Sequence, residues 1–176
     1  MFFFKSKENI NLIDGADKTG NLYTPSNFDY CYKNFKNSMD IITADGGFDF
    51  SIDFNKQELM ASRLILTEVL YAIIMQKKNG IFILKLFDTF LEVSVDILYI
   101  LSSFYEKIEI CKPNTSRMAN SEKYIICKGF KLENSNEYFD IFNGILIQLN
   151  NPINNDKYIK SILSVDIPYY FKNKVE

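Results

Sequence analysis

The chain has 176 residues, of which 47% are hydrophobic and 24% are charged, a balance typical of one folded domain. Its 20 basic and 22 acidic residues give a net charge of −2, so the molecule as a whole does not attract nucleic acid electrostatically. No apolar run is long enough to cross a bilayer, and the opening residues lack the pattern of a signal peptide. These features exclude membrane, secreted and disordered classes.

Histidine is absent, and the three cysteines, Cys31, Cys111 and Cys127, have no paired short spacing. A zinc site and any Ser-His or Cys-His catalytic pair are therefore excluded, and we expect no metal. Reduced cysteines fit a cytoplasmic protein, with the nucleus left open. Acid–base chemistry in this chain would have to use Lys, Asp, Glu or Tyr.

Residues 1–38 are rich in turn signals, and the first regular pattern follows them. Residues 39–44 form a short β-branched apolar run that ends at Asp45-Gly46-Gly47, which predicts a buried strand ending in a turn. Asn55, with Glu58 three residues later, predicts the capped start of a long helix. Lysines and a glycine at 77–80 predict the end of that helix.

The remaining pattern alternates between strands and helices. A continuous apolar run at 81–87 predicts a strand covered on both faces. Further elements are expected as a helix at 89–105, strands at 107–111 and 124–127, and helices at 136–150 and 155–164. Alternating strands and helices indicate an α/β, doubly wound parallel sheet, and the short connection between the last two strands predicts an antiparallel hairpin.

Three polar residues stand at strand positions where an apolar residue is the norm. Asp45 closes the first predicted strand, Lys85 lies inside the second, and Glu122 directly precedes the fourth. Since parallel strands end at the same edge of a sheet, Asp45 and Lys85 should share a crevice there. Taken singly, Asp45 could be a turn former, and Lys85 could extend its ammonium group to water.

Four segments in this order resemble the FtsJ-like (RrmJ-type) ribose 2′-O-methyltransferases, most closely their eukaryotic and large-DNA-virus mRNA-cap branch. The segments are Asp40–Phe48, Asn55–Glu58, Gly80–Asp88 and Cys111–Tyr124. The resemblance implies an S-adenosylmethionine-dependent enzyme that methylates RNA, with capped mRNA as the favoured partner.

The resemblance also implies roles for particular residues. Asp45, Lys85 and Glu122 match three members of the family's Lys-Asp-Lys-Glu tetrad, in which Lys85 would be the base, or the group that orients the target hydroxyl. Desolvation favours such a role because it makes a lysine easier to deprotonate. Asp45 and Gly46 would border the cofactor, with a weaker likeness at Asp17 and Gly20. RNA would be met by the loop residues Lys112, Ser116, Arg117 and Asn120.

The family's glycine-rich cofactor turn and its first tetrad lysine have no counterpart in this sequence. The resemblance therefore implies an incomplete class I methyltransferase (Rossmann-like) fold within a single domain. Residues 1–38 would be a remnant of the cofactor-side half, and 39–176 the C-terminal part. Three explanations stay open: a second chain supplies the missing half, the chain is a shortened product without activity, or it is a non-catalytic RNA- or protein-binding relative.

Overall fold

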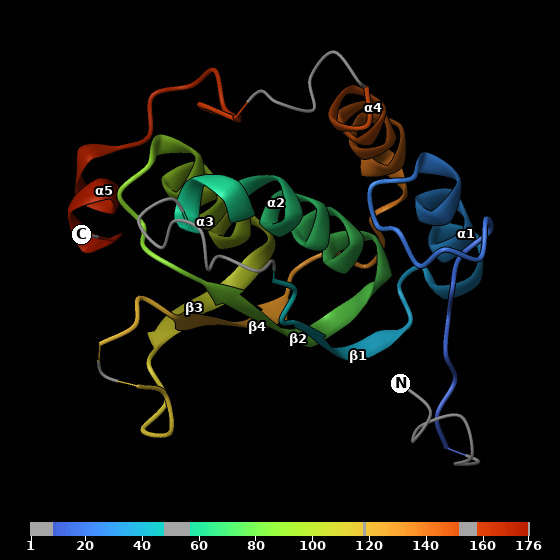
Figure 1. Ribbon diagram of the computed structural model, residues 1–176, viewed down its shortest axis with the longest axis horizontal. Helices are drawn as coiled ribbons and strands as arrows, with labels where there is room; N and C mark the ends of the chain where they lie inside the picture. The colour runs from blue at the N-terminus through green and yellow to red at the C-terminus, as the bar shows by residue number, and fades with distance from the viewer. Residues whose placement is uncertain (1–8, 48–56, 118, 152–157, 176) are drawn as a thin grey trace.

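The computed structural model describes residues 9–47, 57–117, 119–151 and 158–175, which form an α/β fold around a mixed sheet. The sheet has the strand order β1-β2-β4-β3 (Figure 1). β1 runs parallel to β2, whereas β4 is antiparallel to both β2 and β3. The strands are β1 (Met39–Ala44), β2 (Gln76–Leu86), β3 (Tyr105–Cys111) and β4 (Lys123–Phe130). The predicted parallel strands followed by an antiparallel hairpin are confirmed.

Helices cover one face of this sheet. Figure 1 shows α2 and α3 across that face, with α1 and α4 beyond α2 and with α5 beside α3. In the described part of the chain, no helix has both the length and the apolar character to span a bilayer. The helices are α1 (Pro25–Phe35), α2 (Gln57–Met75), α3 (Glu92–Phe104), a 3₁₀ turn η2 (Asn136–Tyr138), α4 (Phe139–Leu149) and α5 (Tyr169–Val175).

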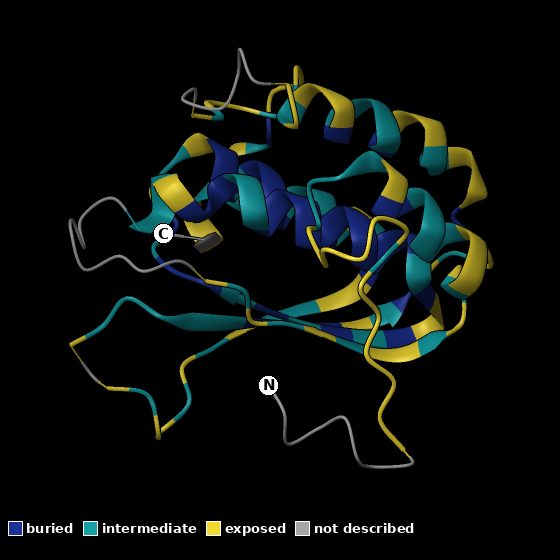
Figure 2. Cartoon of the chain, turned by 45° about the vertical axis from the view of Figure 1, so that its right-hand side comes forward, coloured by how far each residue is buried: buried dark blue, intermediate teal, exposed yellow. Residues whose placement is uncertain are grey.

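The core lies between α2 and the helix-facing side of the sheet. α2 is buried along most of its length (Figure 2), and its Val69 and Ile73 are fully buried. On the sheet, Phe82 and Leu84 of β2 are likewise inaccessible. Burial of a large apolar side chain stabilises a fold by about 1.5–3 kcal/mol, so this layer anchors the strand ends that carry the candidate site.

The second face of the sheet carries no helix among the described residues. β2 alternates between buried Phe82 and Leu84 and partly exposed Ile81 and Ile83, and Ile41 of β1 is 62% exposed. The expectation that both faces of the second strand are covered is therefore wrong for the described structure. The continuous apolar run reflects a sheet whose open face also carries isoleucine.

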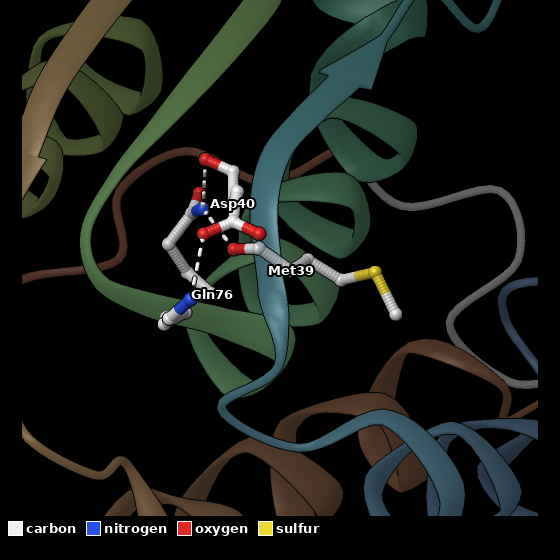
Figure 3. A network of polar contacts seen from close by, with 4 residues as sticks. Met39, Asp40 and Gln76 are labelled. Atoms are coloured by element: carbon white, nitrogen blue, oxygen red, sulfur yellow. Dashed lines mark hydrogen bonds and ion pairs between the residues drawn. The ribbon is translucent and has the colours of Figure 1, made fainter.

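The boundary between α2 and β2 differs from the prediction. The helix ends at Met75, and the segment read as its cationic, glycine-containing stop begins the strand instead. The physical reason is Gln76, whose buried amide donates to the main-chain oxygens of Met39 at 2.7 Å and Asp40 at 3.3 Å (Figure 3). This contact starts the β1–β2 pairing at Met39 and Gln76, before the register shift that precedes Ile41. The expected cap at Asn55 lies outside the described residues.

Two further predictions are corrected at the ends of the chain. The turn-rich reading of 1–38 missed α1, because Pro25, read there as a turn signal, opens the first helical turn. The helix expected at 155–164 is absent over its described part, 158–164. There the main-chain amides of Ile162 and Leu163 donate to the Asp96 carboxylate, at 2.6 and 3.1 Å, instead of to helical carbonyls.

Candidate functional site

Asp45 and Lys85 form an ion pair at the carboxyl ends of β1 and β2. The Nζ atom of Lys85 lies 2.5 Å from Oδ1 of Asp45 and donates to the main-chain oxygen of the same residue at 3.2 Å. The parallel register, with Ala44 opposite Leu84, brings the two residues together. The side chain of Lys85 is 16% exposed and that of Asp45 is 64% exposed. The predicted neighbourhood is thus confirmed, and the catalytic roles stay predictions.

Glu68 of α2 holds the turn that follows Asp45 through a hydrogen bond to its main chain. The amide of Gly46 donates to Oε1 of Glu68 at 3.0 Å. A Cβ atom on Gly46 would lie only 2.3 Å from that oxygen, so no larger residue fits there without movement. A Cβ atom on Gly47 would lie 3.5 Å from Nζ of Lys85, which is an ordinary contact. A larger residue at position 46 therefore requires the side chains of Glu68 and Leu64 to shift, whereas position 47 leaves the approach to Lys85 open.

Glu68 is a buried carboxyl group, 7% exposed, within reach of the charges of the ion pair. Burial raises the pKa of Glu68 to about 7. The hydrogen bond from Gly46 and the positive charge of Lys85 oppose this rise, and the negative charge of Asp45 adds to it. Glu68 therefore changes its charge near neutral pH.

Glu122 interacts with Tyr124. In the sheet Tyr124 stands directly opposite Lys85. Desolvation raises the pKa of Tyr124, and a hydrogen bond with Glu122 and the negative charges of Asp45 and Glu122 act in the same direction. Asp45 thus contacts Lys85 directly, whereas Glu122 interacts with Tyr124, the residue opposite Lys85 in the sheet.

A cavity of about 530 Å³ opens beside this cluster, within the range of small-molecule and cofactor pockets. Gln57 of α2, Phe87 and Asp88 after β2, and the loop before β4 line it. From that loop come Arg117 and Asn120, two of the predicted RNA-binding residues, and the tetrad-like Glu122.

The loop of residues 112–122 is braced by its own side chains. Nζ of Lys112 donates to the main-chain and side-chain oxygens of Asn120, at 2.7 and 2.9 Å, and to the main-chain oxygen of Glu122 at 3.1 Å. The hydroxyl of Ser116 donates to the same Asn120 side chain at 3.1 Å. Lys112, Ser116 and Asn120 therefore hold one another, while Arg117 is exposed.

Asp17 and Gly20 lie in a separate turn that packs on α1. Oδ1 of Asp17 accepts from the amide and the hydroxyl of Thr19, at 2.9 and 2.7 Å, and from the side-chain amide of Asn27 at 2.8 Å. The bonds from Thr19, followed by the one from Asn27, lower the pKa of Asp17. Gly20 has a φ of +70°, which favours glycine. The structure does not place these two residues in the contacts of Asp45 and Gly46.

Glu68 and Tyr124 belong to this site and were not predicted from the sequence. Glu68 is the one carboxylate in the long run 59–75, and an isolated acid within a buried helix is the signal that could have marked it. Tyr124 carried no such signal, because only the strand pairing sets it opposite Lys85. Phe48, the last residue of the first segment that resembles the family, lies outside the described residues. The described residues contain no group of three or more potential metal ligands.

The sequence of this chain is similar to sequences named cap-specific mRNA methyltransferases. A cap-specific mRNA (nucleoside-2′-O-)-methyltransferase 1 of Drosophila melanogaster is 36% identical over 131 residues, 72% of this chain and 17% of that protein. A Caenorhabditis briggsae protein named an inactive cap-specific mRNA (nucleoside-2′-O-)-methyltransferase 1B is 32% identical over 161 residues, 87% of this chain and 19% of that protein. The chain thus spans less than a fifth of these relatives.

A solved structure described as a ribosomal RNA methyltransferase of Plasmodium falciparum resembles the chain with a TM-score of 0.47 and 20% identity, over 69% of this chain and 62% of that one. The model of the family described as FtsJ-like methyltransferase matches residues 4–130. This match covers well over half of the chain and includes the strand ends that carry Asp45, Lys85 and Glu122. The chain therefore belongs to the FtsJ-like methyltransferase family.

Proposed function

We propose that this chain serves S-adenosylmethionine-dependent methylation of an RNA ribose 2′-hydroxyl, with capped mRNA as the favoured substrate. The observation that carries the proposal is the ion pair between Lys85 and Asp45, at 2.5 Å, where two adjacent parallel strands end. Ligands of open α/β sheets bind at this edge. The names of the matched relatives supply the substrate class.

The residues present suit the methyl-transfer end of the cofactor. FtsJ-like methyltransferases in general depend on S-adenosylmethionine, which supplies a methyl group carried on a positively charged sulfonium. Asp45 offers an exposed carboxylate of the opposite charge. The glycine at 47 lets the backbone approach a ligand closely, and even a Cβ atom there would make only an ordinary contact with Lys85. Asp17 and Gly20 are proposed for the adenosine side.

Lys85 is proposed to orient the target hydroxyl or, once its ammonium group has released a proton, to accept the proton of that hydroxyl. A ribose hydroxyl is a weak acid, so a nitrogen held at a fixed position beside it assists its loss of a proton. Asp45 fixes that nitrogen through two contacts, one from its carboxylate and one from its main-chain oxygen. Glu122 would support the arrangement through Tyr124. Alignment of reacting groups of this kind contributes a large share of enzymatic rate.

The loop of residues 112–122 is proposed as the RNA-facing side. Arg117 is exposed at the rim of the 530 Å³ cavity, where a guanidinium can pair with a phosphate. The loop is supported by its own polar residues Lys112, Ser116 and Asn120. Their polar atoms can hydrogen-bond to ribose hydroxyls.

A non-catalytic binding relative is the second candidate, favoured by the similarity to a protein named inactive. A second chain that completes the cofactor site is a third. It is favoured by the position of β1 at the edge of the described sheet, because an edge strand presents unpaired main-chain groups.

Calorimetric titration with S-adenosylmethionine, followed by methyl transfer to capped RNA, tests the enzyme proposal. Lys85→Ala should abolish transfer and leave cofactor affinity largely unchanged. The matched control is Lys77→Ala, which removes a lysine from the other end of β2 that is 55% exposed and paired with Asp40 at 2.9 Å. No binding at millimolar cofactor would favour the non-catalytic candidate, and full activity of Lys85→Ala would refute the role of the lysine.

A further inference from the structure

We propose that Glu68 is a positioning residue of the methyl-transfer site, whose buried carboxyl group fixes the turn of residues 45–47 and makes that turn respond to pH. This inference rests on the proposed function and concerns the regulation of the same site. Glu68 itself stands behind the turn, so it would act through Asp45, Gly46 and Gly47.

The geometry leaves the turn little freedom. Oε1 of Glu68 accepts the Gly46 amide at 3.0 Å. A Cβ atom on Gly46 would lie 2.3 Å from that oxygen and 2.9 Å from Cδ2 of Leu64, so the main chain packs directly against α2. The neighbours of Gly46 are Asp45, which pairs with Lys85, and Gly47, which passes close to the same ammonium group. A shift of the Gly46 amide would therefore move Asp45, the partner of Lys85, and the adjacent Gly47.

Two charged groups act on Glu68, Lys85 from β2 and Asp45 from the end of β1. Tyr23, in the segment before α1, interacts electrostatically with Glu68. The Cζ atom of Arg63 in α2 lies 5.7 Å from the Tyr23 ring centroid. Burial raises the pKa of Tyr23. The positive charge of Arg63 opposes this rise, and the negative charge of Glu68 adds to it.

The charge of Glu68 determines how strongly the turn of residues 45–47 is held. With a pKa of about 7, Glu68 is neutral in mildly acidic solution and ionised in mildly alkaline solution. A hydrogen bond to an ionised acceptor is about twice as strong as one to a neutral acceptor. The Gly46 amide is therefore held more tightly as the pH rises through neutrality, and Asp45, the partner of Lys85, is held with it.

Amide NMR of the free protein tests this without cofactor or RNA. The signals of Gly46 and Gly47 should shift between about pH 5.5 and pH 8.5 with a midpoint near 7. In Glu68→Gln the side-chain oxygen can still accept from Gly46, so the turn should persist while its titration disappears. Glu137→Gln, at an exposed position, is the matched control and should titrate as the natural chain does.

The kinetic counterpart separates positioning from general stability. Glu68→Leu should lower kcat by on the order of 10-fold to 100-fold, and Glu68→Gln should restore most of it while removing its change with pH across neutrality. Gly46 signals that do not move with pH in the natural chain, or that titrate unchanged in Glu68→Gln, would overturn the proposal. Failure to bind S-adenosylmethionine would overturn the proposed function alone, because the NMR result does not depend on it.

Discussion

The hydroxyl of Tyr105 donates a buried hydrogen bond of 3.1 Å to Oε1 of Gln76, which links the first residue of β3 to the first residue of β2. The Gln76 amide nitrogen donates in turn to Met39 and Asp40 at the start of β1 (Figure 3). One side chain with no exposed surface thus joins the beginnings of three strands.

Replacing Gln76 by leucine should therefore destabilise the fold. The substitution leaves the Tyr105 hydroxyl and the main-chain oxygens of β1 without their partner, at a cost of about 1–3 kcal/mol for each buried polar group. Tyr105→Phe removes a single bond and should cost less. Urea denaturation followed by circular dichroism compares the two, and equal stability of Gln76→Leu and the natural chain would contradict this account.

Asp96 of α3 holds the segment that was expected to be helical. Its Oδ2 atom accepts from the hydroxyl of Ser161 and from the amides of Ile162 and Leu163, and the residue is 2% exposed. Asp96→Ala should cost about 1–3 kcal/mol and release the segment, which limited proteolysis would detect as new cleavage near 158–163. Ser161→Ala loses one of three bonds and should stay resistant. Equal protection of both variants would show that the carboxylate does not anchor the segment.

The sequence correctly predicted features that depend on short stretches of the chain. The β-branched run before Asp45 predicted the strand β1, although none of its residues is buried as expected, because β1 lies at the edge of the sheet. The parallel order of the first two strands predicted that Asp45 and Lys85 would meet. The short connection between 111 and 123 predicted an antiparallel pair, which β3 and β4 form. These predictions succeeded because each depends on a few consecutive residues and on the geometry of sheets.

What the sequence could not supply depends on contacts between distant residues. Gln76 ends α2 early because its amide finds the main chain of β1, 36 and 37 positions away. Glu68 meets Gly46 across 22 positions, and Tyr124 meets Lys85 only through the register of β4 on β2. Polar groups such as these look like ordinary helix and strand residues until the tertiary structure gives them partners.

Glu68 should give the stability of the protein a distinctive dependence on pH. Its pKa is about 7 in the folded chain against 4.5 for an ordinary glutamate, so between these values the folded state binds more protons than the unfolded state. Stability should therefore fall as the pH rises from 4.5 to 7, by up to about 3 kcal/mol, since one pKa unit corresponds to about 1.4 kcal/mol. Glu68→Gln should flatten this slope in urea titrations. An unchanged slope would assign the dependence to another group.

Glu109 should make the stability of the folded protein rise with pH, the opposite of the effect of Glu68, and over a lower pH range. Hydrogen bonds and charge from Lys107 and Lys128 hold the pKa of Glu109 at about 2. The folded state then binds fewer protons than the unfolded state between about pH 4.5 and pH 2, so this contribution is present at neutral pH and is lost as the pH falls. Glu109→Gln should make the stability of the protein less sensitive to acid. It should not affect the slope of stability against pH between pH 4.5 and 7. Thermal melts at two ionic strengths provide a check, because salt screens exposed pairs.

The glycines at 46 and 47 should respond differently to the same substitution. Gly46→Ala places a Cβ atom 2.3 Å from Oε1 of Glu68, so the Glu68 side chain or the turn has to move and their hydrogen bond is disturbed, at a cost of about 1–3 kcal/mol. Gly47→Ala meets only Lys85 at 3.5 Å and should leave stability nearly unchanged, while its methyl group narrows the approach to the ammonium. Gly144→Ala is the control, because nothing lies within 4 Å and alanine favours the helix by about 1 kcal/mol. Melting temperatures should rank Gly144→Ala highest and Gly46→Ala lowest, and a Gly46→Ala protein as stable as Gly47→Ala would show that Glu68 does not constrain the turn.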